Sequence, residues 1–242
     1  DMLTNEVFEK LENEILPDYL LKMRWFGGKA RNIQSIKITD HAEVPMKNNG
    51  SVVLLIEVSY ESGMPEIYQL PVTFSGGKDA AKILENYPQA VIGRLTVDKE
   101  EGVLYDALFG RELQQFIFTK MAAKHTINLK NSEIYLYGKK KLKQHIKEHE
   151  EIKSKVLSAE QSNTSIVYDS NFFLKIYRKL DKAINPDLEI NRFLSEEAKF
   201  EHTRPLGQDH HFYEFGASMR TLGYHPLFAF GRFFLYFGTS KP

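Results

Sequence analysis

The sequence predicts an α+β protein built from two dissimilar domains. Apolar residues at helical spacing open the chain, β-rich segments separated by turn signals follow, and a second strand, turn and helix pattern begins after a charged stretch. The chain has 242 residues, of which 42% are hydrophobic and 12% aromatic. That length and composition suffice for buried cores in one large domain or two small ones.

Composition excludes several classes of partner. The 32 basic and 32 acidic residues cancel, so no overall field would draw the chain to nucleic acid or to anionic lipid. Cysteine is absent, which is typical of a reducing compartment. No apolar run approaches the roughly 20 residues that cross a bilayer, and residues 1–10 lack the order of a secretory signal. We expect a soluble cytoplasmic protein with no nucleic-acid or membrane partner.

The first domain is expected to open with a helix over residues 7–23, where apolar residues recur at threes and fours and Pro17 favours a kink or break. An antiparallel meander follows, because turn signals separate segments that are rich in β-branched and aromatic residues. Its strands are predicted over residues 33–38, 52–60 and 66–74.

The remainder of this domain is predicted as a strand over residues 91–97, a turn at Glu101-Gly102 and a helix over 104–121. These elements complete the first domain, assigned to residues 1–125. The run from Ser75 to Lys78 resembles part of a phosphate-binding loop. It is not one, because Val72 stands where the first glycine is required, and we interpret the run as the entry to a helix.

A charged segment, assigned to residues 126–155 as helix or linker, precedes the second domain. Its lysine run at 139–141 suggests a nucleic-acid patch. Glu148, Glu150 and Glu151 offset those lysines, however, and no aromatic residue interleaves with them, so a solvated helix or linker is the better interpretation.

The second domain is assigned to residues 156–207. Strands are predicted over residues 165–168 and 172–178 around a turn at 169–171. A helix is then expected from Asn185, because Asn185 suits the N-cap, Pro186 the first turn, and Asp187 and Glu189 the positive end of the helix dipole.

Lys175 is the first candidate for chemistry. It stands in the middle of an apolar strand, where an ammonium is costly unless it meets a carboxylate or a phosphate. A strand lysine paired with a helix glutamate, here Glu189, is how kinase-like folds position nucleotide phosphates. The alternative is a lysine that snorkels at an edge strand while Glu189 is solvated, and spacing alone leaves both open.

A polar stretch at residues 160–165 stands just before the strand that precedes Lys175. Its small side chains and backbone N–H groups suit phosphate oxygens. Polar hairpin turns are also common without any ligand, so by itself the stretch leaves function undecided.

Taken together, residues 158–165, 173–178 and 185–194 resemble the N-lobe of bacterial maltokinases in order and spacing. Residues 20–31, centred on the run from Arg24 through Trp25 to Arg31, and residues 102–108 resemble the maltokinase N-terminal cap domain. The resemblance covers residues 3–207. It implies a cap domain followed by a protein-kinase-like N-lobe of the aminoglycoside-phosphotransferase branch.

The resemblance also implies site residues and cofactors. The polar loop would cover the ATP phosphates, Lys175 would contact them, and Glu189 would hold Lys175. The implied phosphate-binding set is Gln161, Ser162, Asn163, Thr164, Ser165, Lys175 and Glu189. Magnesium would bridge the phosphates. Trp25 and Phe26 are expected to pack the first helix onto the sheet, with Arg24, Lys29 and Arg31 at the rim. This interpretation is favoured over a surface for a partner or ligand.

The last segment, residues 208–242, departs from the family pattern. It holds 7 of the chain's 17 Phe residues and shows no sustained helical or strand period, so no fold is predicted for it. A frameshift or mispredicted gene end would produce this abrupt change, and truncation followed by genuine sequence is the alternative. The adjacent histidines His210 and His211 lack the spacing of metal ligands, and we expect no metal site.

The resemblance implies that the complete parent uses ATP to convert maltose to maltose 1-phosphate, in trehalose and α-glucan (glycogen) metabolism. The catalytic aspartate and the sugar site of the family belong to a C-lobe, which we expect to be absent from this chain. We therefore expect no catalytic residue here and no activity from this chain alone. The alternative function is a non-catalytic module that docks on a trehalose synthase or on a separate kinase lobe.

Overall fold

The computed structural model describes residues 4–46, 50–97, 99–128, 132–137, 140–157, 163–169, 172–180, 210–211, 216–221 and 233–238. The chain divides into two compact units, Asp1–Leu113 and Gln114–Pro242. Both combine helices with mostly antiparallel sheet. The predicted α+β class is confirmed at this level.

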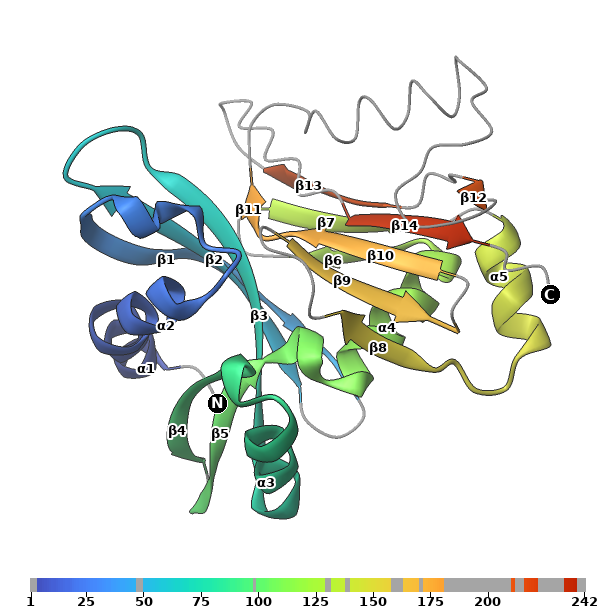
Figure 1. The fold of residues 1–242 in the computed structure, drawn as a ribbon, viewed down its shortest axis with the longest axis horizontal. Helices are drawn as coiled ribbons and strands as arrows, with labels where there is room; N and C mark the ends of the chain where they lie inside the picture. The colour runs from blue at the N-terminus through green and yellow to red at the C-terminus, as the bar shows by residue number, and fades with distance from the viewer. Residues whose placement is uncertain are drawn as a thin grey trace. The chain divides into compact units, whose positions relative to one another are not determined.

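The first unit consists of a helical start, a long antiparallel sheet and one further helix (Figure 1). Its helical elements are α1 (Asn5–Lys10), η1 (Leu11–Ile15), α2 (Leu16–Lys22), η2 (Gly27–Ala30), α3 (Gly77–Asn86), η3 (Pro88–Ala90) and η4 (Ala107–Phe109). Its strands are β1 (Ile33–Val44), β2 (Ser51–Tyr60), β3 (Glu66–Gly76), β4 (Val91–Val97) and β5 (Glu100–Asp106), which lie side by side in the order β1-β2-β3-β5-β4. The predicted meander and the strand over 91–97 are confirmed.

The helical start is continuous but irregular. Thr4 caps α1, since its side chain accepts a hydrogen bond from the Val7 N–H. A π-helical turn, η1, then separates α1 from α2, and Pro17 lies in the first turn of α2. Proline lacks an N–H and crowds the preceding turn, and π-turns accommodate such a mismatch. The predicted helix is confirmed, but the chain does not break at Pro17: the irregular π-helical turn lies just before it, and α2 continues through it.

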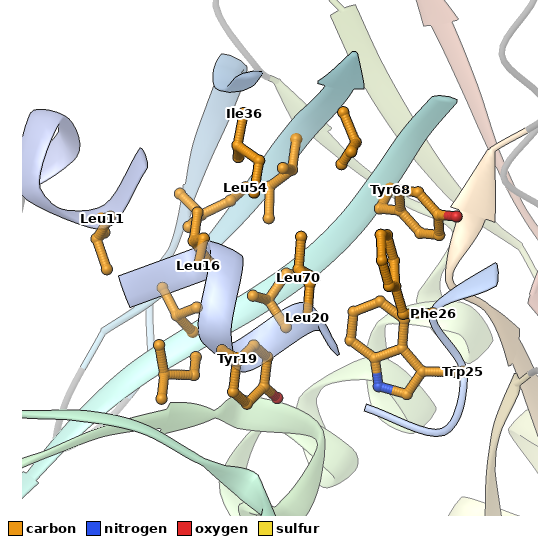
Figure 2. Packing of buried hydrophobic residues seen from close by; sticks show 14 of the residues in the cluster. Leu11, Leu16, Tyr19, Leu20, Trp25, Phe26, Ile36, Leu54, Tyr68 and Leu70 are labelled. Atoms are coloured by element: carbon orange, nitrogen blue, oxygen red, sulfur yellow. The ribbon is translucent and has the colours of Figure 1, made fainter. Parts of the chain in front are cut away.

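The helical start packs on the sheet through one apolar cluster (Figure 2). Leu16 and Leu20 of α2 and Leu54 of β2 are fully buried. Figure 2 shows Trp25 and Phe26 beside Tyr68, and the Phe26 and Tyr68 rings lie 5.2 Å apart between centroids. The predicted packing role of Trp25 and Phe26 is confirmed, and burial of large apolar surface is what holds this unit together.

The predicted helix over 104–121 is wrong at its start. Leu104 lies in β5 opposite Phe74 of β3, and α4 begins only at Arg111 (Arg111–Ala123). The predicted turn at Glu101-Gly102 is also wrong, because both residues lie in β5. Lys99, with a φ of 72°, precedes β5 instead. The entry to a helix predicted at 75–78 is confirmed, since α3 begins at Gly77.

The second unit contains two antiparallel sheets. Its elements after α4 are β6 (His125–Asn128), β7 (Ser132–Tyr137), α5 (Lys140–Glu148), β8 (Ser154–Leu157), β9 (Asn163–Tyr168), β10 (Phe172–Tyr177), β11 (Lys179–Leu180), β12 (His210–His211), β13 (Gly216–Thr221) and β14 (Phe233–Gly238). One sheet has the order β12-β14-β10-β9-β8, and the other has the order β13-β7-β6. The predicted hairpin is confirmed as β9 and β10.

Some elements of this unit were not predicted. Strands β6 and β7 lie in the segment interpreted as charged helix or linker, where α5 is the only helix among the described residues. The tail without a predicted fold contributes β13, which pairs with β7, and β14, which pairs with β10. The helix predicted from Asn185 lies outside the described residues.

Aromatic packing forms the core of the second unit. Phe118 of α4 lies against Tyr168 of β9 and Phe172 of β10, with ring centroids 4.4 Å and 5.3 Å away. The Tyr168 hydroxyl donates a hydrogen bond to the Gln114 carbonyl oxygen at 2.9 Å, and burial raises the pKa of Tyr168. Helix α4 therefore covers one face of the β9–β10 hairpin.

Candidate functional site

The candidate nucleotide site centres on the hairpin of β9 and β10. Lys175 lies directly opposite Ser165, and Tyr177 lies opposite Asn163. Because side chains alternate between the faces of a strand, these four residues share one face. The two strands thus bring a lysine, a hydroxyl and an amide into neighbouring positions.

The opposite face of the hairpin is the core. Ile166, Tyr168, Leu174 and Ile176 are fully buried there. Lys175, by contrast, is half-buried, and its Nζ lies 5.1 Å from the centroid of the Tyr177 ring. An ammonium over an aromatic face is stabilised by the ring's quadrupole. The apolar residues around Lys175 in the sequence suggested a buried ammonium. Because side chains alternate along β10, the Lys175 side chain instead lies on the face away from the apolar core.

Thr164 belongs to the core face and not to the face of Lys175. Its hydroxyl accepts a hydrogen bond from Nε of Arg178 at 2.9 Å, and Arg178 is fully buried. The other residues implied by the resemblance, Gln161, Ser162 and Glu189, lie outside the described residues. Among the described ones, the structure groups Asn163 and Ser165 with Lys175 and separates Thr164 from them.

A second polar cluster, in the first unit, was not singled out from the sequence. One oxygen of Glu66, Oε2, accepts hydrogen bonds from the hydroxyls of Tyr60 at 2.7 Å and Tyr68 at 2.6 Å. The same oxygen pairs with Arg31 at 2.6 Å, whose guanidinium carbon lies 3.5 Å from the centroid of the Tyr60 ring. Burial and the bond to Glu66 raise the pKa of Tyr60 to about 12, and the same two causes raise the pKa of Tyr68.

This cluster explains part of the sequence that follows Trp25. A Cβ added at Gly28 would collide with the Tyr60 hydroxyl and with the Phe26 ring. Gly28 is therefore needed for the close approach of η2 to β2, and Arg31 then reaches Glu66 on β3. The motif positions the connection between helix and sheet.

Residues 19–109 match the family model of the maltokinase N-terminal cap domain. The chain contains a maltokinase N-terminal cap domain. The matched region of the cap domain begins within α2 and ends at η4, so it includes every strand from β1 to β5. The resemblance to the maltokinase family drawn from the sequence is thereby confirmed for this part of the chain.

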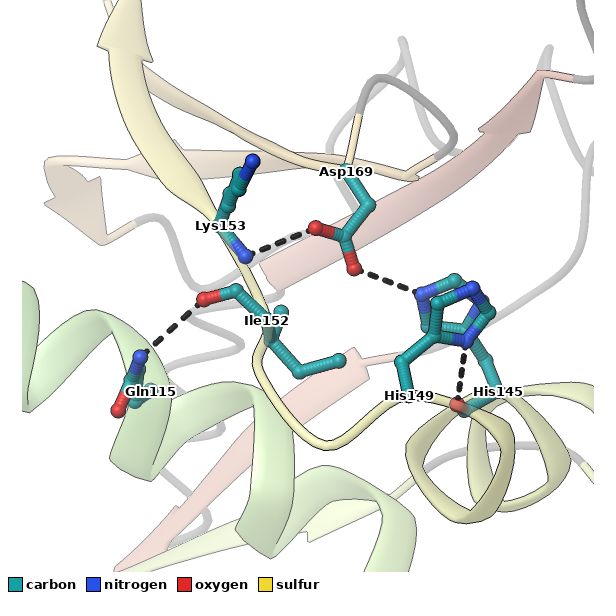
Figure 3. Close-up of polar contacts among 6 residues, drawn as sticks. All are labelled: Gln115, His145, His149, Ile152, Lys153 and Asp169. Carbon is teal, nitrogen blue, oxygen red and sulfur yellow. Dashed lines mark hydrogen bonds and ion pairs between the residues drawn. The ribbon is translucent and has the colours of Figure 1, made fainter.

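A third cluster, in the second unit, joins α5 to the turn after β9 (Figure 3). His145 Nε2 lies 2.8 Å from Asp169 Oδ2, and the Lys153 N–H donates to Asp169 Oδ1 at 2.8 Å. An ionised carboxylate only accepts hydrogen bonds, so His145 donates. Spacing gave no signal for this pair, which is separated by 24 residues.

Two kinds of feature are absent from the residues that the structure describes. No group of three or more histidine, cysteine, aspartate or glutamate side chains is arranged there to hold a metal ion. Nor does that part of the chain include a helix with the length and apolarity needed to cross a membrane.

Proposed function

We propose that this chain is the cap domain and ATP-binding wall of a maltokinase, an enzyme that transfers the γ-phosphate of ATP to the anomeric hydroxyl of maltose and yields maltose 1-phosphate. The observation that carries the proposal is the cap-domain match over residues 19–109. The hairpin with Lys175 follows that domain in the sequence, where the resemblance implies an ATP-binding lobe, and it supplies a lysine suited to contact the phosphates.

The order of the strands supports the nucleotide role. In protein kinases a loop covers the ATP phosphates, and a lysine on the third strand contacts them. Here β8, β9 and β10 are successive antiparallel neighbours, residues 158–162 connect the first to the second, and Lys175 lies on the third. The polar stretch and the lysine therefore stand in the same order along the chain.

The face that carries Lys175 has suitable chemistry for a phosphate group. The ammonium supplies charge, while the Ser165 hydroxyl and the Asn163 amide can donate hydrogen bonds, and bonds between charged groups and phosphate oxygens are the strong ones. We assign Asn163, Ser165 and Lys175 to this wall. The resemblance adds Gln161, Ser162 and Glu189.

Magnesium would accompany the nucleotide and neutralise the phosphate charge. Within the part of the chain that the structure describes, no group of three or more acidic, cysteine or histidine side chains is arranged to hold a metal ion. We therefore assign no metal ligand to them, and the role of Lys175 is derived from its own charge. Maltose as the acceptor, and a trehalose synthase as partner, follow from the family resemblance.

Titration of the 242-residue chain with Mg-ATP tests the nucleotide site. For one wall of a cleft we expect a Kd of about 1 mM. At about 10 mM ligand, such binding stabilises the fold by ~1.4 kcal/mol and raises the melting temperature by roughly 3–5 °C. A melting temperature that Mg-ATP leaves unmoved would remove the nucleotide assignment.

The acceptor sugar needs a separate test. In a kinase polypeptide where this chain is followed by a catalytic lobe, phosphorus-31 NMR should detect an anomeric phosphate ester when maltose is supplied. Glucose is the matched control. If both sugars yielded the product equally, the protein would still be a sugar kinase, but it would not be specific for maltose.

A further inference from the structure

The start of β8 is fixed by hydrogen bonds to two other parts of the second unit (Figure 3). The Asp169 N–H donates to the Lys153 carbonyl oxygen at 2.9 Å, and the Lys153 N–H donates to the Asp169 carboxylate at 2.8 Å. From α4, the Gln115 side chain donates to the Ile152 carbonyl oxygen at 3.1 Å. Residues 152 and 153 are thus tied both to α4 and to the turn after β9.

His145 holds the carboxylate that makes this connection. Its side chain is 9% exposed and that of Asp169 is 14% exposed, so water competes little for their bond. The His145 ring stacks on His149 with centroids 4.0 Å apart and meets Phe172 edge to face at 4.7 Å. His149 in turn donates through Nδ1 to the His145 carbonyl oxygen at 2.9 Å. The imidazole therefore has a fixed position from which to orient Asp169.

The backbone of Asp169 is suited to this place. Its φ is 48°, the left-handed region that aspartate and asparagine adopt more readily than most residues. This conformation ends β9 while leaving both the N–H and the carboxylate directed at Lys153. The residue type is therefore explained by the backbone and by the hydrogen bonds together.

The register of β8 matters for the candidate site. Strand β8 has only four residues, none of them buried, and register is weakly specified in a strand that buries neither face. Leu157 lies opposite Ser165, and Ser165 lies opposite Lys175, so one row crosses the three strands. The Lys153–Asp169 pair continues the same ladder beyond Ser154 and Tyr168. Any slip of β8 would change the residue beside Ser165.

We infer that the Asp169–His145 pair is a positioning device, which fixes β8 in register with β9 and thereby holds Ser165 and Lys175 in their nucleotide-binding arrangement. The inference rests on the proposed function. Asp169 and His145 are positioning residues and touch no substrate, because they lie at the turn end of the hairpin while Ser165 and Lys175 lie within the strands.

Three variants of the full chain separate the contributions. Asp169→Gly deletes the carboxylate and leaves the left-handed backbone without strain. Asp169→Asn keeps the backbone preference and an amide oxygen that can accept the Lys153 N–H. His145→Phe keeps an aromatic ring against Phe172 but removes the donor.

Glu12→Ala is the matched control in the first unit. Glu12 likewise accepts one hydrogen bond from a backbone N–H, that of Ile38 at 2.7 Å, and one from a side chain, that of Lys37 at 2.8 Å. Its removal deletes the same kinds of bond at a place where no nucleotide contact is proposed. It therefore reports what lost stability alone does to binding.

The readout is the Kd of Mg-ATP, obtained from melting temperatures up to about 20 mM ligand. We expect Asp169→Gly and His145→Phe to weaken binding about tenfold, the affinity equivalent of one hydrogen bond to a charged group. Asp169→Asn should bind Mg-ATP with most of the wild-type affinity, in contrast to Asp169→Gly. Glu12→Ala should lower the melting temperature without changing the Kd.

Amide hydrogen exchange gives a second, ligand-independent measurement. Asp169→Gly should speed exchange at residues 154–157, and Glu12→Ala should not. If Asp169→Gly binds Mg-ATP with the wild-type Kd, the positioning role is overturned while the proposed function stands. If the wild-type chain does not bind Mg-ATP, the proposed function and the positioning role both fail, and faster exchange would then reveal a purely structural anchor.

Discussion

Lys175 is the residue on which the nucleotide assignment depends most directly. It is half-buried and lies beside Tyr177 and opposite Ser165, so its replacement removes a charge from the sheet face without opening the core. We expect Lys175→Ala to abolish the stabilisation by Mg-ATP and to leave the melting temperature without ligand nearly unchanged, because desolvation of the ammonium no longer opposes folding.

The matched control for this experiment is Lys155→Ala. Lys155 is an exposed lysine on β8 of the same sheet, so both variants lose one positive charge. Thermal melts with and without Mg-ATP compare them. Two results together would contradict the nucleotide role: a much lower melting temperature for Lys175→Ala, and a wild-type melting temperature that Mg-ATP does not change. Lys175 would then form a structural ion pair instead.

Ionisation of Tyr60 makes the stability of the cap domain fall as the pH rises through the alkaline range. Its folded pKa of about 12 exceeds the unfolded value of about 10, so ionisation favours the unfolded state. The stabilisation is complete below about pH 10 and is lost as pH rises from there toward about 12. Tyr68 acts in the same direction, since its pKa is also raised.

Urea unfolding at a series of alkaline pH values measures this effect. The unfolding free energy of Tyr60→Phe should decline less steeply above about pH 10 than that of the wild type. Glu66 still accepts hydrogen bonds from Tyr68 and Arg31 in that variant. Parallel declines in the two proteins would show that Tyr60 ionises equally in both states.

At the scale of elements, the close approach of η2 to β2 is testable through its two glycines. A Cβ at Gly28 would overlap Tyr60 and Phe26, whereas the nearest atom to a Cβ at Gly27 is the Tyr68 hydroxyl at an ordinary 3.5 Å. We expect Gly28→Ala to destabilise the cap domain by about 1–3 kcal/mol and Gly27→Ala to be nearly neutral. Denaturant midpoints decide this, and equal midpoints would contradict the packing argument.

The sequence predicted those elements whose signals are local. Strands β1 to β3 and the β9–β10 hairpin could be predicted because each strand is rich in β-branched and aromatic residues and turn residues mark its ends. The start of α4 was misplaced because a short apolar run, here the one around Leu104, fits a buried strand and a helix equally. Leu104 lies in a strand because it pairs with Phe74 on β3, and that partner is distant in the sequence.

The candidate site was predictable in part for the same reason. Lys175 and the polar stretch stand close enough in sequence for a hairpin to join them. The division between Ser165 and Thr164 depends on strand faces, and the bond of Thr164 to Arg178 emerges only from the fold. The His145–Asp169 pair and the Glu66 cluster unite distant elements, for which single-sequence patterns carry no signal.

At the scale of the whole molecule, the cap domain has its own core. Every member of its main apolar cluster lies between Leu11 and Leu104. We expect a polypeptide of residues 4–110 to unfold cooperatively by itself, with a melting temperature that Mg-ATP leaves unmoved, because the proposed phosphate wall lies entirely in the second unit. Calorimetry of this polypeptide beside the full chain measures both properties. A shift caused by Mg-ATP in the isolated cap domain would relocate the nucleotide site.

The alternation of faces along β10 also constrains how this protein can change through evolution. We expect the connection between β9 and β10 to tolerate added length after Asp169, because a longer turn there leaves both strands and the bonds of Asp169 in place. A single residue inserted between Phe172 and Lys175 would exchange the faces of all later positions, moving the ammonium into the core and an apolar side chain out of it. Lineages that keep this chemistry should therefore preserve the spacing from Phe172 to Lys175, or alter it by two.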